Sequence, residues 1–454
     1  MPPTLPPLAA EAVRLLQALL RFDTSNPPGN ERPAADYIAG VLTADGIAPT
    51  VIETAPGRGN VVARLRGDGT AAPLLLFSHL DVVPVERAQW TVDPFGGEIR
   101  AGYVYGRGAL DMKGIGAMQL AVFLDLARQA AAGVITLKRD LILAATADEE
   151  TNANQGIGLL AASHPELLRA EYALTEFGGF PMRVAGKTFY PIQTAEKGTA
   201  WITLRARGTP GHASVPRDDN AVVVLARAVE RLGAARLPMR LTATARAHIA
   251  GLADALGGPA AVALRAALSG EPMFPELADR ILQGSALAAE LHAVTHNTVT
   301  PTGLRAGFMT NVVPSSAEAT LDCRTLPGDT AADVIAEMRR ALGDAAAGLE
   351  FQLDSDSPGL EFPADTPLMT TIHEVLRQHD PHGIPIPYML TGATDARHVA
   401  ALGAICYGFS PMSFESDEAF SDLMHGHDER ISLKGIDWGT QALRDVVLRT
   451  VSAP

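Results

Sequence analysis

The residues of this sequence best suited to metal chemistry lie where short apolar runs end. The first pair is His79 and Asp81, which follow the run Leu74–Ser78. Because side chains alternate along an extended strand, His79 and Asp81 face the same side. This suits an imidazole that binds a metal ion and is held by a carboxylate, which fixes the ring and raises its basicity. A surface turn has the same His-x-Asp spacing, so the pair alone does not define a site.

A second candidate ligand is Asp111, in the glycine-rich stretch Gly106–Gly114. The glycines permit a tight backbone, and an apolar helix is predicted to begin near Gly116. Asp111 therefore lies where a carboxylate can either bind a metal ion or cap the N-terminus of that helix. Both interpretations remain open at this point.

Two further predicted strand ends carry carboxylates. Glu149 and Glu150 follow the run Leu141–Ala145, and Glu176 follows the run Tyr172–Thr175. Two adjacent carboxylates at the end of a strand can diverge, so that one binds a metal ion and the other a water molecule. Solvated acidic residues after a strand are the alternative interpretation. Open α/β sheets bind their ligands at the carboxyl ends of the strands, which favours a site at these residues.

These stretches, with a late one at Met424–Glu429, resemble in order and spacing the dizinc family of aminoacylase-1, acetylornithine deacetylase, succinyl-diaminopimelate desuccinylase and glutamate carboxypeptidase. That family carries His-x-Asp, a glycine-rich segment ending in Asp, Glu-Glu, a further Asp or Glu, and a late His four residues before a Glu. The resemblance covers nearly the whole chain. His425 matches the late histidine because Glu429 lies four residues beyond it, whereas His427 does not.

The resemblance implies two zinc ions per subunit, although ligands of this kind also accept cobalt or manganese. One ion would be bound by His79 and Glu176. The other would be bound by Glu150 and His425, and Asp111 would bridge both ions. The Asp111–Met112 peptide bond is often cis in this family. Asp81 would orient His79.

The implied reaction is the hydrolysis of an amide bond. Two metal ions would lower the pKa of a bridging water from about 15.7 toward about 7. Glu149 would then act as the general base, taking a proton as hydroxide attacks the carbonyl and returning it to the departing amine.

The resemblance also assigns residues outside the metal ligands. His212, in Gly208–Ser214, matches a histidine that reaches the partner subunit's site and stabilises the tetrahedral oxyanion. Asn311 and Arg324 match positions that contact substrate, and Arg324 could pair with a substrate carboxylate, with a surface salt bridge as the alternative. Gly392 matches a glycine-rich turn that lines the pocket. A homodimer through the domain that carries His212 is implied.

The elements expected around these residues are short strands that alternate with amphipathic helices, which predicts a mostly parallel mixed sheet flanked by helices. An amphipathic helix is expected within Met1–Phe22. The predicted strands are Asn60–Leu65, Leu74–Ser78, Leu141–Ala145 and Tyr172–Thr175. Past Pro363 this pattern resumes, with a helix around Met369–Gln378 and a closing helix from Leu433.

A different pattern lies between them and predicts an inserted α+β lid or dimerisation domain. Its elements are a strand, a helix, two strands, a helix and a strand: Trp201–Arg207, Asn220–Leu232, Leu304–Thr310, Ala317–Arg324, Ala331–Leu342 and Leu349–Leu353. This is a β-α-β-β-α-β unit, with a helical insertion at about residues 237–297. The catalytic domain is therefore predicted at residues 1–195 and 354–454, and the inserted domain at residues 196–353.

Composition and charge limit the class of protein. With 454 residues, 47% hydrophobic and 19% charged, the chain can form two globular domains. A formal net charge of -14 disfavours nucleic acid and anionic membranes as partners, because both attract clustered Lys and Arg. Two cysteines, Cys323 and Cys406, are too few for a disulfide framework. We expect a cytoplasmic enzyme with buried, reduced thiols.

The predicted function is metal-dependent hydrolysis of small N-acyl amino acids or short peptides, of the carboxypeptidase, dipeptidase or N-acyl-amino-acid hydrolase type. The long insertion disfavours the first alternative, a dedicated biosynthetic deacylase for acetylornithine or succinyl-diaminopimelate. The second alternative is a non-catalytic binding protein on the same scaffold, which predicts a missing ligand or base. No ligand or base of the pattern is missing.

Overall fold

A computed structural model of the chain describes residues 5–151, 153–269, 286–414 and 423–452. It divides the chain into two compact units, of which unit 1 comprises residues 1–194, 362–387 and 394–454, and unit 2 comprises residues 195–361 and 388–393. Unit 2 therefore interrupts unit 1 in sequence. Its main segment ends at residue 361, eight residues beyond the predicted 353, because the last long strand of unit 2 continues to Ser357 and a short strand, Leu360–Glu361, follows it.

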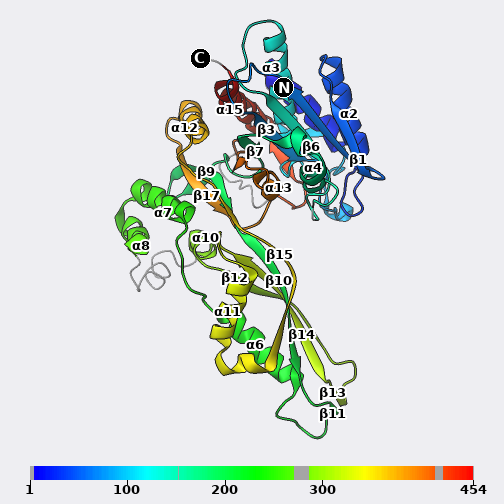
Figure 1. Cartoon of the computed structure of the whole chain (residues 1–454), viewed down its shortest axis with the longest axis vertical. Helices are drawn as coiled ribbons and strands as arrows, with labels where there is room; N and C mark the ends of the chain where they lie inside the picture. Colours follow the sequence, from blue (N-terminus) through cyan, green and yellow to red (C-terminus); the bar gives the residue numbers. More distant parts are fainter. Residues whose placement is uncertain (1–4, 152, 270–285, 415–422, 453–454) are drawn as a thin grey trace. The chain divides into compact units, whose positions relative to one another are not determined.

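Unit 1 is built on a mixed sheet with a parallel centre (Figure 1). Its strand order is β1-β2-β6-β3-β7-β18-β9-β16, where β16 is Leu360–Glu361, and β8 and β17 also pair with β9. The strands β6, β3, β7 and β18 are parallel neighbours, whereas β1, β2 and β9 join antiparallel. These strands are β1 (Thr50–Ala55), β2 (Arg58–Leu65), β3 (Leu74–His79), β6 (Leu141–Thr146), β7 (Tyr172–Thr175), β8 (Met182–Val184), β9 (Lys187–Glu196), β17 (Ile384–Leu390) and β18 (Ile405–Gly408).

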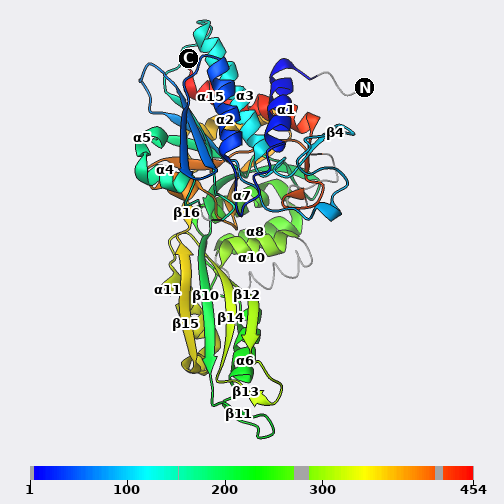
Figure 2. The same cartoon turned by 90° about the vertical axis from the view of Figure 1, so that its right-hand side faces the viewer.

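Helices pack on this sheet, and α1, α3 and α15 pack against one another (Figure 2). The helices of unit 1 are α1 (Pro7–Leu20), α2 (Arg32–Ala44), α3 (Lys113–Ala131), α4 (Ile157–Ser163), α5 (Pro165–Leu168), α12 (Pro367–His379), α13 (Ala396–Ala400) and α15 (Leu433–Val451), with a 3-10 turn at Arg87–Gln89. A separate small sheet joins β4 (Ile99–Arg100), β5 (Tyr103–Tyr105) and β19 (Arg430–Ser432). The predicted fold class, a mixed sheet flanked by helices, is confirmed.

The core of unit 1 explains why the sequences of the central strands are continuous apolar runs. All six residues of β3 and all six of β6 are buried, as expected for strands covered on both faces. The helix α3 is buried along most of its length, and leucines of α1 and α15 complete the same core. The strand ends, where polar residues follow, are therefore held by rigid packed elements.

Unit 2 contains a four-stranded antiparallel sheet of order β12-β14-β10-β15, with α6 and α11 packed on it (Figure 1). Its elements are β10 (Gly198–Arg207), β11 (Gly211–His212), α6 (Ala221–Ala234), α7 (Ala243–Leu256), α8 (Gly258–Ser269), α10 (Ala286–Thr295), β12 (Thr298–Ala306), β13 (Val312–Val313), β14 (Ser316–Thr325), α11 (Ala331–Leu342), a 3-10 helix (Gly343–Gly348), β15 (Leu349–Ser357) and β16 (Leu360–Glu361). This is the predicted β-α-β-β-α-β order, with α7, α8 and α10 inserted.

One strand of unit 2 lies elsewhere than predicted. The run Leu304–Thr310 was expected as a strand, but β12 spans Thr298–Ala306. The prediction was wrong because Pro301 and Gly303 are residues that strands usually lack. In the structure they are accommodated, since β12 is the edge of its sheet and its register shifts between these two residues. Proline is tolerated at an edge or bulge, where no ladder bond is lost.

Three further expectations concern the whole chain. Cys323 and Cys406 are buried, and neither is part of a disulfide among the described residues. Among the described residues, no helix is long and apolar enough to cross a bilayer. Residues 1–4 of the predicted first helix and residues 270–285 of the predicted insertion lie outside the described residues.

Candidate metal centre

Three parallel strands bring candidate ligands to one edge of the unit 1 sheet. His79 is the last residue of β3 and pairs with Thr146, the last residue of β6. Glu149 and Glu150 follow β6, and Glu176 follows β7. Because these strands are parallel neighbours, their carboxyl ends meet at the same edge.

Asp111 lies between two groups of ligands and contributes one oxygen to each. Its Oδ1 is 3.1 Å from Nε2 of His79, and its Oδ2 is 3.1 Å from Nε2 of His425. Nε2 of His79 is also 3.5 Å from Oε2 of Glu176, and Nε2 of His425 is 3.5 Å from Oε1 of Glu150. Within each group of three, the candidate ligand atoms lie within 4.8 Å of one another.

The donor set suits a pair of divalent cations. Two imidazole nitrogens and three carboxylates are the ligands that zinc, cobalt and manganese accept. The acidic side chains are crowded: burial and the charge of Asp111 raise the pKa of Glu176 to about 8. Burial and the charge of Glu176 also raise the pKa of Glu149 well above its usual range. Cations between these carboxylates would relieve their repulsion, so the residues fit a dinuclear metal site.

Two acidic residues near these ligands are not in either group of three. Glu149 interacts electrostatically with Glu176, His79 and Asp395. Asp395 is 3% exposed, and neither of its carboxylate oxygens has a hydrogen-bond partner among the described residues. Its burial raises its pKa to about 7. The sequence pattern marks the glycine-rich turn Gly392–Asp395 but gives the Asp395 carboxylate no role.

Asp81 contacts His79 through its backbone as well as its side chain. Nδ1 of His79 lies 2.9 Å from the backbone oxygen of Asp81 and 3.6 Å from its Oδ1. The Asp81 carboxylate accepts the backbone N–H groups of Glu149 at Oδ1 and of Glu150 at Oδ2, both at 3.1 Å. Asp81 therefore connects the end of β3 to the turn that carries the two glutamates.

Glu429 fixes the loop that carries Asp111. Its fully buried carboxylate accepts hydrogen bonds from the backbone N–H groups of Gly108, Leu110 and Asp111 and from Arg107. Arg107 also donates to the backbone oxygen of His425, at 3.1 Å. The peptide bond Asp111–Met112 is cis.

The two late histidines differ in their surroundings. His425 lies in the second group of three, whereas His427 belongs to neither group, although both residues are exposed. His425 has a positive φ of 59°. Hydrogen bonds to Asp111 and Glu150 raise the pKa of His425 to about 10.

His212 and Asn311 lie together in unit 2. His212 is in β11, which pairs with β13, and the backbone oxygen of Asn311 accepts the N–H of Ala213 at 3.0 Å. Nδ1 of His212 accepts the backbone N–H of Ser214 at 3.2 Å and lies 2.8 Å from its Oγ. Because Nδ1 is an acceptor, the ring proton is assigned to Nε2.

Arg324 and Gly392 are the remaining candidates in unit 2. Arg324 forms a bidentate pair with Asp322 two residues away, with Nε to Oδ1 at 2.7 Å and Nη2 to Oδ2 at 2.9 Å. This is the salt bridge that the sequence left open as an alternative. A Cβ at Gly392 would meet only Leu390, at 3.8 Å, so the local backbone does not require glycine there.

The site geometry and the sequence agree with one family. Residues 75–449 match peptidase family M20/M25/M40. The chain belongs to this family. As an M20 family member with two candidate metal-ligand groups, it is a metal-dependent hydrolase of the metallopeptidase class.

Curated relatives include enzymes that act on acylated amino acids. The N-fatty-acyl-amino acid synthase/hydrolase PM20D1 of Xenopus tropicalis is 30% identical over 383 residues, which cover 82% of this chain and 71% of that protein. Aminoacylase-1 of Homo sapiens is 28% identical over 446 residues, covering 95% and 94%.

Among solved structures, the M20 family metallo-carboxypeptidase Sso-CP2 from Sulfolobus solfataricus has a TM-score of 0.71 at 18% identity, covering 96% of this chain and 98% of that one. Human carnosine dipeptidase 1 has a TM-score of 0.67 at 14% identity, covering 97% and 95%. At these identities the likeness shows the M20 fold.

Proposed function

We propose that this M20 family protein hydrolyses the amide bond of N-acyl amino acids, using two zinc ions bound at the edge of the unit 1 sheet. The observation that carries the proposal is the position of Asp111, whose two oxygens face different histidines, each with a further carboxylate. We assign one ion to His79 and Glu176, the other to Glu150 and His425, with Asp111 shared. Cobalt and manganese suit the same donors.

Metal ions bound there would polarise the scissile carbonyl and make a water molecule more acidic. Glu149 is the proposed general base: it takes a proton from the attacking water and returns it to the amine nitrogen as the amide bond breaks. Its electrostatic contact with His79 and Glu176 supports this role, because the base must lie beside the metal ligands.

The substrate class rests on the named activities of the relatives. PM20D1 and aminoacylase-1 are named for acylated amino acids and match this chain at 30% and 28% identity. Carnosine dipeptidase 1 is similar in fold at 14% identity. We therefore favour N-acyl amino acids as substrates, with dipeptides and carboxypeptidase substrates as the alternative for the same bond chemistry.

Unit 2 is proposed to act as a lid and to form a homodimer. In this proposal, His212 donates from Nε2 to the oxyanion at the partner subunit's site, as the family resemblance implies. The hydrogen bond from Ser214 to Nδ1 supports this role because it leaves Nε2 as the donor. Asn311 and Arg324 would contact the substrate, with Arg324 exchanging Asp322 for a substrate carboxylate, and Gly392 would line the pocket.

The proposal includes a cytoplasmic location and no nucleic-acid or membrane partner. A formal net charge of -14 and two buried cysteines without a disulfide are compatible with it.

A substrate panel tests the proposed function. Zinc-loaded protein is incubated with N-acyl derivatives of one amino acid that differ in acyl length, and with dipeptides ending in the same amino acid, while amine release is measured. We expect acyl amino acids to be cleaved. The variant Glu149→Gln should retain its metal and lose at least about 100-fold in kcat, because general bases contribute about 10²–10⁴-fold. No cleavage of any compound by the zinc-loaded protein, or a Glu149→Gln variant with more than about a tenth of the wild-type kcat, would contradict the proposal.

A further inference from the structure

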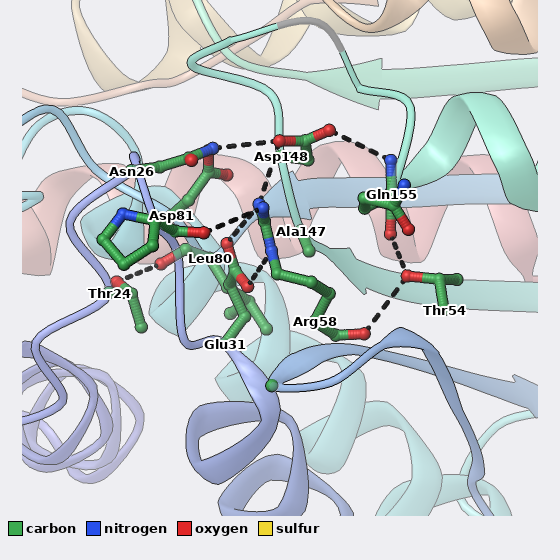
Figure 3. A network of polar contacts seen from close by, with 12 residues as sticks. Thr24, Asn26, Glu31, Thr54, Arg58, Leu80, Asp81, Ala147, Asp148 and Gln155 are labelled. Carbon is green, nitrogen blue, oxygen red and sulfur yellow. Dashed lines mark hydrogen bonds and ion pairs between the residues drawn. The ribbon is translucent and has the colours of Figure 1, made fainter.

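A buried polar network surrounds Asp148, the residue directly before Glu149 and Glu150 (Figure 3). At its centre is Asp148, whose Oδ1 accepts hydrogen bonds from Arg58 at 2.9 Å, Asn26 at 3.1 Å and Thr151 at 2.7 Å. Oδ2 of Asp148 accepts the backbone N–H of Gln155 at 3.0 Å. Four donors on one carboxylate define its orientation within the turn.

The backbone of this turn requires such support. Asp148 has a φ of 71°, in the left-handed region, which residues with a Cβ adopt only uncommonly and Asp mostly with local hydrogen bonds to its side chain. This backbone conformation forms a turn directly before Glu149 and Glu150. The bonds to the Asp148 side chain therefore hold a turn that the backbone alone would not favour.

Asn26 connects the turn to the end of β3. Its Nδ2 donates to Oδ2 of Asp81 at 2.9 Å as well as to Asp148. Asn26 is itself fixed by the backbone, because its N–H donates to the oxygen of Val82 at 2.9 Å. One buried amide group thus links the residue beside His79 to the residue before Glu149 (Figure 3).

Arg58 supplies positive charge to the same network. Its guanidinium binds Glu31 through two bonds, Nε to Oε2 at 2.8 Å and Nη2 to Oε1 at 2.9 Å, in addition to Asp148. The Arg58 side chain is 11% exposed, and those of Glu31 and Asp148 are 0% and 6% exposed. Buried charged groups this close together are tolerated only when they form well-aligned ion pairs and hydrogen bonds.

We propose that Asn26 and Arg58 are positioning residues for the metal centre: through Asp81 and Asp148 they hold the turn so that Glu150 faces a metal site and Glu149 faces the substrate. This inference rests on the proposed function for Glu149, whereas its part concerning Glu150 rests on metal binding alone. None of the other proposed ligands is on this turn, so loss of the network weakens the site of Glu150 and His425 more than that of His79 and Glu176.

The experiment compares Asn26→Ala and Arg58→Lys with a matched control, Arg64→Lys. Arg64 lies on the same strand, β2, and pairs with Asp140 at 3.0 Å, but it is opposite Ile142 near the start of β6, away from the turn. Metal-free protein is titrated with Zn²⁺ by calorimetry, and kcat and KM are measured on a cleaved N-acyl amino acid. Urea unfolding of the metal-free proteins records the loss of stability separately.

We expect Asn26→Ala and Arg58→Lys to weaken one of two zinc-binding steps by about 10–100-fold and to lower kcat by at least about 10-fold, with KM within about 3-fold. Asn26→Asp should be at least as damaging as Asn26→Ala, because a third carboxylate would face Asp81 and Asp148. Arg64→Lys should lose stability alone. If Arg58→Lys does not fold, Thr151→Val replaces it, since this change removes one bond to Asp148 at an exposed residue and should give a smaller effect in the same direction.

Two normal zinc-binding steps in Asn26→Ala and in Arg58→Lys or its replacement Thr151→Val would overturn the inference, as would equal losses in Arg64→Lys. Failure of the proposed function is distinguishable: the wild type would then bind two ions and cleave nothing, and the zinc titrations would still decide the role of the network at Glu150.

Discussion

Oε1 of Glu429 lies 2.7 Å from the backbone nitrogen of Leu110, the residue before the proposed bridging ligand Asp111. The four-residue spacing between His425 and Glu429 therefore has a physical meaning. The histidine belongs to the second group of candidate ligands, and the glutamate holds the loop that carries Asp111.

Glu429→Gln should weaken zinc binding by about 10–100-fold and lower the free energy of unfolding. The amide NH₂ of the new side chain would face backbone N–H groups or Arg107, all of which are donors. Zinc titration and urea unfolding check this. The matched control is Glu337→Gln in unit 2, where a buried glutamate binds Arg240 at 2.6 Å and Asn297 at 3.0 Å. If the two variants lose stability alike and neither loses zinc affinity, Glu429 has no special role at the site.

The two late histidines should behave differently. His425→Ala is expected to lose one of two zinc ions, because it removes one ligand of the second group of three. His427→Ala should retain both, since His427 is outside both groups of three. Metal analysis of the two purified variants decides the matter, and equal losses or the reverse order would mean that the spacing to Glu429 points to the wrong histidine.

His212→Ala should abolish turnover while zinc content and folding persist, because an oxyanion donor is lost and no ligand is. If the donor acts across a homodimer, mixing His212→Ala with Glu149→Gln subunits restores one working site in each mixed dimer, which makes up about half of a random mixture. Differently tagged subunits purified together provide these dimers. Inactive mixed dimers would place His212 in the site of its own chain or in a structural role.

Acid should destabilise the folded chain partly through His373 in α12. Burial, with the nearby charge of Arg377, lowers the pKa of His373 from 6.5 to about 4 in the folded state. The folded state therefore favours the neutral ring. The contribution of His373 to the free energy of unfolding is complete above pH 6.5 and is lost as the pH falls toward 4. Urea unfolding at pH 7 and pH 5 should show a smaller loss for His373→Leu than for the wild type. Equal losses would mean that His373 is not buried in its neutral form.

The sequence located the candidate ligands His79, Glu150 and Glu176 because each lies at or just past the end of an apolar run, whereas Asp111 and His425 were assigned as ligands only by the resemblance to the family. His79 and Glu176 end buried strands, and such strands can be recognised from their composition alone. The bonds between elements could not be predicted in this way. Asn26 and Asp81 are 55 residues apart in sequence, and nothing in either local pattern indicates their hydrogen bond. The edge strand β12 was misplaced for a related reason, because only its place in the sheet makes Pro301 acceptable.

The most direct test of the central claim is a zinc titration of chelated protein in which bound metal and cleavage of an N-acyl amino acid are recorded at each step. We predict two ions per chain, no turnover without metal, and full turnover only when both ions are bound. His79→Ala and His425→Ala should each bind one ion at most. Turnover that persists after complete chelation, or binding of a single ion by the wild type, would contradict a dinuclear site bridged by Asp111.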